Sequence, residues 1–172
     1  MLNAQTTTPR VYIACLAAYN EGHLHGKWID VDTADNVNEK IQHILKTSPA
    51  FSAEEWAIHD FEGFGSIQIS EYTGVETLVE YAMFISEHGE LGAEVLAHFS
   101  NDFDDAKTCL EDNYHGAYKS EEDFVIELTE QTIEIPKHLE YYIDYEKMAR
   151  NYFINDFFSI EANGMTHVFS HI

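Results

Sequence analysis

Negative charge is concentrated in the middle of this chain, and no other feature restricts its fold as much. Residues 71–146 contain twenty Asp and Glu residues against Lys107, Lys119 and Lys137, a net charge of −17. Residues 1–70 carry a net charge of −5, and residues 147–172 carry none. Like charge at this density destabilises a compact state through self-repulsion. The central block must therefore keep its carboxylates on solvated surfaces.

The chain is nevertheless built to fold. Its formal net charge is −22 over 172 residues, but 45% of the residues are hydrophobic and 13% are aromatic, well above the content of a disordered acidic tail. The acidity argues against binding to bare nucleic acid or to an anionic membrane. It favours a cationic partner, cations in solution, or a high-salt cell.

Cysteine usage and the N-terminus predict a cytoplasmic protein. Cys15 and Cys109 have no metal-binding spacing, which favours two reduced, mostly buried thiols. The first residues, "MLNAQTTTPR", lack the basic start and apolar core of a signal peptide. No run approaches the roughly 18 apolar residues of a membrane span.

Residues 1–70 predict a small sheet with one helix. The stretch "RVYIACLAAY" (10–19) is apolar on both faces, as in a central strand, while "GKWIDV" (26–31) and "EEWAIHDF" (54–61) predict two more strands. Residues 33–46 predict a helix with Thr33 or Asp35 as its cap. Its apolar positions are Val37, Ile41, Ile44 and Leu45.

The acidic block predicts helices, and Gly89 is expected to end the first of them before a short successor in residues 90–99. Asp102 and Ser120 are expected to cap the next two. The apolar stripes, at helical spacing, are Val75, Leu78, Val79, Ala82 and Met83; then Phe103, Ala106, Leu110 and Tyr114; then Phe124, Val125 and Leu128.

The last part of the chain predicts a return to mixed structure. "TIEI" (132–135) alternates like a strand, and "FFSIEA" (157–162) and "MTHVF" (165–169) resemble closing strands. Tyr142, Tyr145, Ala149 and Tyr152 predict one more helix. The expected fold class is α+β, as three small modules in a row: α+β, then helical, then α+β.

Carboxylates on these helices are candidate binding groups. Asp104, Asp105, Glu111 and Asp112 lie away from one apolar stripe, and Asp123, Glu127 and Glu130 follow i, i+4, i+7 spacing on another helix. Like charges at this spacing lie about 5–6 Å apart and cost helix stability. Any single acid can equally be solvated surface or part of a cap, as in Ser120-Glu121-Glu122-Asp123.

No catalytic or metal site is predicted. The sequence has no G-x-S-x-G, P-loop or H-E-x-x-H motif, His23 and His25 have no further ligand cluster, and "DFDDAKTCLED" lacks the central glycine of a calcium-binding loop. Seven tyrosines among the acids can serve an interface or a core: Tyr72, Tyr81, Tyr114, Tyr118, Tyr141, Tyr142 and Tyr145.

Three functions fit so acidic a chain: a halophile-type surface, an acidic enzyme with an unrecognised pocket, and a mimic of a polyanion. The neutral residues 147–172 argue against the first, and only the abundance of carboxylates supports the second. Duplex DNA carries one charge per about 1.7 Å. At that density the chain's net charge matches about 37 Å of duplex, about 11 base pairs.

Four segments in order resemble the ArdA family of antirestriction proteins: "ACLAAYNEGHLHGKWID", "EEWAIHDFEGF", "EDNYHGAYKSEEDFVIEL" and "YIDYEKMARNYF". The resemblance runs from about residue 9 to residue 169. It implies an elongated homodimer of three-domain chains that mimics B-form DNA and occupies the DNA-binding groove of type I restriction-modification enzymes, in their methyltransferase core. Incoming mobile-element DNA would thereby be protected.

The resemblance implies no catalytic residue, no cofactor and no bound nucleic acid or membrane. The implied domains are residues 1–70, residues 71–108, and residues 109–172 with the dimer contact. Within the matched segments, the acids expected on the mimic surface are Glu111, Asp112, Glu121, Glu122, Asp123 and Glu127. By charge pattern alone, the surface also includes Glu76, Glu80, Glu87, Glu90, Glu94, Asp104, Asp105 and Glu130.

Overall fold

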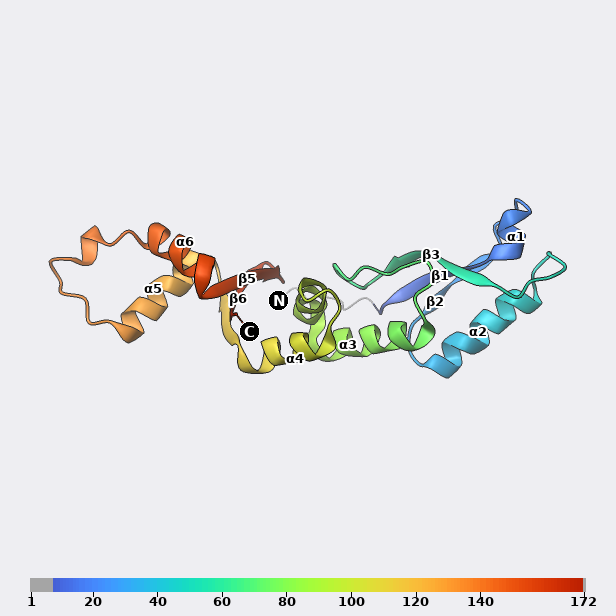
Figure 1. Ribbon diagram of the computed structural model, residues 1–172, viewed down its shortest axis with the longest axis horizontal. Coiled ribbons are helices and arrows are strands. Elements are labelled where there is room, and N and C mark those ends of the chain that lie inside the picture. The colour runs from blue at the N-terminus through green and yellow to red at the C-terminus, as the bar shows by residue number, and fades with distance from the viewer. Residues whose placement is uncertain (1–7, 172) are drawn as a thin grey trace. The chain divides into compact units, whose positions relative to one another are not determined.

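The computed structural model describes residues 8–171 and confirms the α+β class. It contains helices together with two separate three-stranded antiparallel sheets. The chain divides into two compact units, residues 1–93 (unit 1) and 94–172 (unit 2), each with one of the sheets (Figure 1). The division into three modules stays a prediction.

The sheet of unit 1 has the order β2-β1-β3, with β1 (Arg10–Cys15) in the centre as predicted. β2 (Gly26–Asp30) and β3 (Trp56–Glu62) pair with β1 on either side, both antiparallel. Val11 and Ile13 of β1 are completely buried, because a central strand is covered on its faces and paired on both edges. This strand anchors the core of unit 1.

The strand predicted over residues 10–19 is too long. It ends at Cys15, and Leu16–Asn20 form a short helix, α1. The last sheet contacts are the backbone bonds from Cys15 N to His25 O (2.9 Å) and from Leu16 N to Glu55 O (3.0 Å). Beyond them the chain has no ladder partner among the described strands, so its backbone groups bond locally instead.

Helix α2 (Ala34–Lys46) lies along this sheet (Figure 1). Thr33 is its N-cap, because its side chain accepts a hydrogen bond from Asn36 N at 3.4 Å. The predicted apolar positions are all buried, which confirms the helix and selects Thr33 over Asp35 as the cap: Val37, Ile41, Ile44 and Leu45.

Helix α3 (Val75–His98) is interrupted at Gly89, where the first of the two predicted helices was expected to end. Gly89 has φ 66° and ψ −154°, a backbone region that is essentially restricted to glycine. Val75, Leu78 and Ala82 are buried as predicted, but Met83 is 64% exposed. The buried face is rotated away from Met83 and is completed by Tyr81, Phe84 and Ile85.

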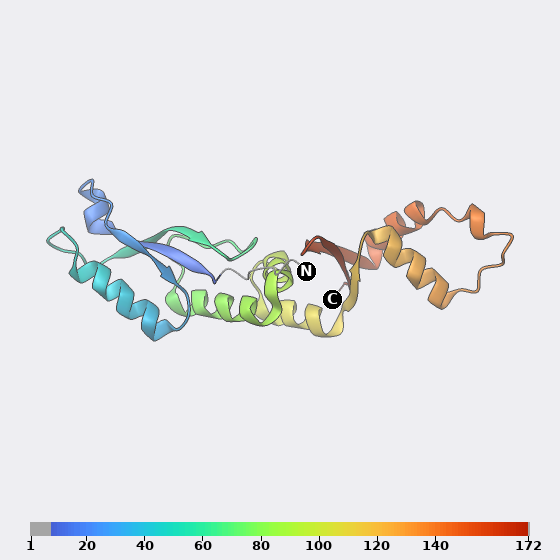
Figure 2. The same cartoon turned by 180° about the vertical axis from the view of Figure 1, so that it is seen from behind.

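Unit 2 folds around a sheet of order β4-β6-β5, made of β4 (Tyr114–Tyr118), β5 (Phe157–Ala162) and β6 (Met165–Ser170). Helices α5 (Glu121–Thr132) and α6 (Tyr145–Asn155) run side by side in both views (Figures 1 and 2). The core of this part consists of Phe124, Val125, Ala149 and Val168.

Helix α4 (Phe103–Asp112) begins at its predicted cap, Asp102, whose side chain accepts from Asp104 N and Asp105 N at 3.0 and 3.1 Å. It ends before Tyr114, which was predicted as its last apolar position but begins β4 instead. The reason is non-local, since Tyr114 pairs with Phe169 of β6. Local helical spacing gave no indication of that partner.

Two further predictions in unit 2 need correction. The "TIEI" stretch is no strand: Thr132 ends α5 and residues 133–136 are irregular, because no described strand pairs with them. Tyr142 lies in a separate 3₁₀ turn, η1 (Glu140–Tyr142), and α6 begins only at Tyr145 behind the cap Asp144. Both predicted closing strands, β5 and β6, are confirmed.

Both cysteines are free and buried, as predicted. Cys15 Sγ lies 3.3 Å from Ser48 Oγ in unit 1. Burial raises the pKa of the Cys109 thiol to about 11, because an apolar environment disfavours the thiolate. Cys109 is therefore a packed side chain of α4 and a poor nucleophile at neutral pH.

Candidate functional site

The acidic side chains are displayed almost completely to solvent. Of the 31 Asp and Glu residues, 28 are exposed and none is buried, while Glu62, Glu94 and Glu121 are half-buried. Unit 1 contains 14 acids against four Lys and Arg residues, and unit 2 contains 17 against five. Each unit thus carries a large negative charge of its own.

Helix α5 shows how the sequence produces such a display. Ser120 Oγ accepts a hydrogen bond from Asp123 N at 3.1 Å and starts the helix. Phe124 and Val125 then turn into the core of unit 2. Asp123, Glu127 and Glu130 are exposed, and their spacing of four and seven residues places them on one face. The burial of the apolar face directs the carboxylates outward.

Two acids of α5 are held in place by neighbouring side chains. The half-buried Glu121 accepts a hydrogen bond from Ser159 Oγ of β5 at 2.7 Å, and Glu127 accepts one from Gln131 Nε2 at 3.0 Å. Tyr118 has a raised pKa, mainly through burial and then through the negative charge of Glu127. Glu121 and Glu127 therefore also have structural contacts, whereas Glu122 is exposed.

Helix α4 carries the second group of predicted acids in unit 2. Asp104 and Asp105 lie in its first turn, and Glu111 and Asp112 lie in its last turn; all four are exposed. The first pair complements the positive end of the helix dipole, whereas the second pair opposes its negative end. Local helix stability thus explains Asp104 and Asp105, but not Glu111 and Asp112.

The remaining predicted acids lie on α3. Glu76, Glu80 and Glu87 are exposed, and intervals of four and seven residues bring them onto one face of the first half of the helix. The carboxylate of Glu87 lies 3.9 Å from His88 Nε2. Glu90 follows the interruption at Gly89 and is exposed, and the half-buried Glu94 begins unit 2.

Basic side chains do little to neutralise these acids. Arg150 pairs with Glu146 at 2.9 Å and Arg10 pairs with Glu62, and neither of those acids belongs to the predicted set. Within residues 8–171, no Lys or Arg forms an ion pair with Glu76, Glu80, Glu111, Asp112 or Glu122. Their charge is therefore available to a partner.

Repulsion between the exposed carboxylates costs less free energy than the burial of apolar side chains contributes. A like-charge pair at i, i+4, such as Asp123 and Glu127, destabilises a helix by about 0.2–0.5 kcal/mol. Burial of one large apolar side chain, such as Phe124 on the inner face of α5, contributes about 1.5–3 kcal/mol. The buried faces thus outweigh the repulsion between the exposed ones, and a folded helix can hold like charges at fixed positions.

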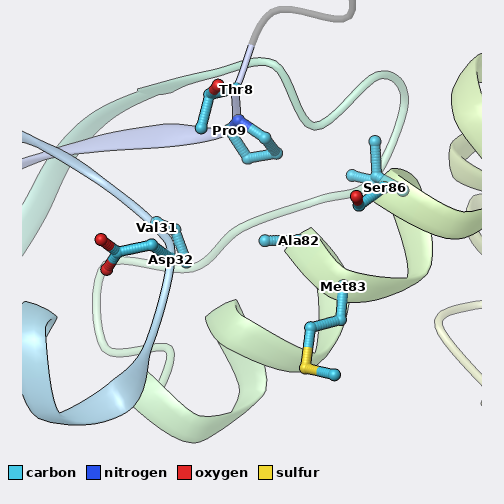
Figure 3. A pocket seen from close by; sticks show the side chains of 8 residues that line it. Thr8, Pro9, Val31, Asp32, Ala82, Met83 and Ser86 are labelled. Atoms are coloured by element: carbon cyan, nitrogen blue, oxygen red, sulfur yellow. The ribbon is translucent and has the colours of Figure 1, made fainter.

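A cavity in unit 1 offers little for acid–base chemistry (Figure 3). It measures about 300 Å³ and is lined by segments that include Pro9, Ala82 and Ser86. Its one ionisable side chain, Asp32, has a lowered pKa, first because of a hydrogen bond from Thr33 N. The Asp32 carboxylate points away from Ala82 and Ser86 (Figure 3). In residues 8–171 no three His, Cys, Asp or Glu side chains are grouped to hold a metal.

The prediction left out several acids of the same block. The segment from the end of α5 to the first turn of α6 adds four exposed carboxylates: Glu134, Glu140, Asp144 and Glu146. All four belong to the acidic block of residues 71–146. Two of the tyrosines for which the sequence allowed either a core or an interface role lie in this segment. Both are highly exposed, Tyr141 at 91% and Tyr142 at 83%. Tyr81, by contrast, is buried.

Comparisons with known proteins agree with the resemblance that the four segments indicated. Within the described residues, no helix is both long and apolar enough to cross a bilayer. A comparison with curated proteins finds no match. A family model described as antirestriction protein (ArdA) matches residues 11–166, most of the chain, and the chain therefore belongs to the ArdA family of antirestriction proteins.

Proposed function

We propose that this antirestriction protein acts as a DNA mimic on type I restriction-modification enzymes. Its carboxylates take the place of phosphates and occupy the DNA-binding groove of the methyltransferase core, so that cleavage, and modification with it, is blocked. The groove accepts the protein because phosphate contacts supply much of the affinity of DNA-binding proteins, whereas base contacts specify sequence. The protein acts in the cytoplasm of a bacterial host and protects incoming mobile-element DNA.

The exposure of 28 of the 31 acidic side chains carries this proposal. The proposed contact residues are the acids of α3, α4 and α5 described above, which project from helices whose opposite faces are buried. Helices hold charges at regular positions, as a DNA backbone does. We further propose that the chain acts as a homodimer through residues after about 109, which doubles the length of duplex that it can replace.

The first experiment is a mixing run on a gel-filtration column with a type I methyltransferase core, repeated with increasing duplex DNA. We expect a complex that excess DNA displaces and that weakens steeply as salt rises, because released counterions drive binding to a cationic groove. After separation at high salt, the enzyme should regain full activity. Permanent loss of enzyme activity would indicate chemical modification, and a complex indifferent to DNA would refute a shared groove.

The second experiment neutralises charges in groups. We expect the combination of Glu122→Gln, Asp123→Asn and Glu130→Gln to weaken inhibition about 3- to 150-fold, since each exposed charge contributes about 0.2–1 kcal/mol. A matched control, Asp35→Asn with Glu54→Gln and Glu55→Gln, removes the same charge, and Asp35 shares with Asp123 a place in the first turn of a helix. If both variants lost inhibition equally, the effect would come from net charge alone and not from the carboxylates of α5.

A further inference from the structure

The outer edge of β2 in unit 1 is unpaired. β2 bonds to β1 through alternate residues, as the bonds from Val31 N to Pro9 O (2.8 Å) and from Cys15 N to His25 O (2.9 Å) show. Because backbone groups alternate along a strand, Gly26, Trp28 and Asp30 direct their N–H and C=O groups to the other side. No strand within residues 8–171 pairs with that side.

A groove lies between this edge and α2. Its volume is about 510 Å³. Ile29 and Ile44 are buried and give it an apolar floor, and Lys27 and Lys40 line it from the strand and from the helix. The lining also contains Asn36, Glu39 and His43. The groove therefore gathers two of the chain's nine Lys and Arg residues against one acid, while the chain as a whole carries −22.

We infer that this groove binds an extended acidic segment of a partner protein, which adds to the sheet as a fourth strand beside β2. The free N–H and C=O groups of Gly26, Trp28 and Asp30 would supply the backbone bonds of strand addition. Every second side chain of the added strand would face α2, where carboxylates meet Lys27 and Lys40.

The lysines also explain why such an edge does not pair indiscriminately. A lysine on an edge strand discourages pairing with another strand, because its charge loses water without gaining a partner. An acidic strand provides that partner, so Lys27 selects against neutral strands and for acidic ones. Two acids oppose this binding at close range: Glu39 in the lining and Asp32, whose charge interacts with Lys40. The more distant negative charges oppose it only weakly, since salt at physiological strength screens them beyond about 8 Å.

This groove is separate from the acidic helix faces, and its ligand has the opposite charge. The inference does not depend on the proposed DNA mimicry: a type I enzyme offers a cationic groove to the acids, whereas the β2–α2 groove takes an anionic peptide. A variant that loses one activity should keep the other. Restriction inhibition by Lys27→Gln with Lys40→Gln is expected to remain within about twofold of the original, as neither lysine lies in the acidic block.

The probe is a fluorescently labelled peptide of ten alternating glutamate and valine residues, titrated with the whole protein. We expect saturable binding that weakens at least about tenfold in Lys27→Gln with Lys40→Gln, because close charge pairs are lost. Lys46→Gln, on the same helix but outside the groove lining, should change binding by less than about twofold. The same peptide with lysine in place of glutamate should not bind.

Hydrogen exchange on the complex gives a second readout, specific to strand addition. The amides of Gly26, Trp28 and Asp30 should become protected when the peptide binds, whereas those of Lys27 and Ile29, already directed to β1, should change little. The inference is overturned by absence of saturable binding, by equal losses in Lys46→Gln and in Lys27→Gln with Lys40→Gln, or by unchanged exchange at the three outward amides. Equal binding of a single-stranded oligonucleotide of the same charge would also overturn it in favour of a nucleic-acid ligand.

Discussion

At the scale of single residues, aromatic and titratable side chains meet around Phe158 of unit 2. The His98 imidazole stacks on the Phe158 ring at 4.6 Å between centroids and meets Phe99 edge-on at 4.9 Å. His171 lies on the same phenyl ring at 5.3 Å. The pKa of His98 is lowered, first by partial burial and then by the charge of His171. The structure thus favours the neutral imidazole.

This contact predicts a loss of stability in mild acid. Because the folded state holds the pKa of His98 below its unfolded value of about 6.5, the unfolded state binds the proton first. The free energy of unfolding should therefore fall as the pH drops through the unfolded pKa, and level off below the folded one. Urea titrations at about pH 7.5 and about pH 5.5 measure the difference.

His98→Gln should reduce this pH dependence, and His23→Gln, in an exposed loop of unit 1, should leave it unchanged. An equal pH dependence in the original protein and in the His98 variant would show that other groups control it.

At the scale of elements, helix starts are encoded locally and can be tested one at a time. Ser120→Ala removes the cap of α5 and should lower the free energy of unfolding by about 1 kcal/mol, because Asp123 N loses its acceptor. Far-UV circular dichroism in urea measures this change. Tryptophan fluorescence should shift less, since Trp28 and Trp56 both lie in unit 1.

Ser52→Ala, at an exposed turn, is the matched control and should have no comparable effect. If Ser120→Ala and Ser52→Ala had the same free energy of unfolding, the Ser120 cap would contribute nothing to stability.

At the scale of the whole molecule, salt should act in opposite directions on folding and on partner binding. Screening weakens repulsion within a chain of net charge −22, so added salt should raise the free energy of unfolding. The same screening should weaken binding to a cationic enzyme groove. Urea unfolding and inhibition, each measured across one series of salt concentrations, should give slopes of opposite sign.

The control for this prediction is the folded state at low salt. The buried faces of both units outweigh the surface repulsion, so the protein should remain folded when salt is low. Folding only at molar salt would instead support a halophile-type protein. Salt slopes of the same sign would show that repulsion does not limit stability.

The sequence predicted structure well wherever interactions within four residues decide it. The caps Asp102 and Ser120 and the buried stripe of α2 were found from the local sequence, and Thr33 was one of the two caps that it offered for α2. Met83 was misplaced because helical spacing leaves a borderline position open, and only packing turned Tyr81 and Phe84 inward in its place. The candidate acids came from the charge pattern and from the segments that resemble the ArdA family. All are exposed except the half-buried Glu94 and Glu121, because the apolar residues opposite them turn into the core.

What the sequence determined by itself is the amount and position of the charge, the starts of α2, α4 and α5, and the buried face of α2. These depend on side chains that are neighbours along the chain. What only the tertiary structure decided depends on residues far apart in the chain: the pairing of Tyr114 with Phe169 that makes β4 a strand, the end of β1 at Cys15, and the unpaired edge of β2. Strand pairing is the physical reason, because a strand is stabilised by bonds to a distant partner that no local pattern identifies.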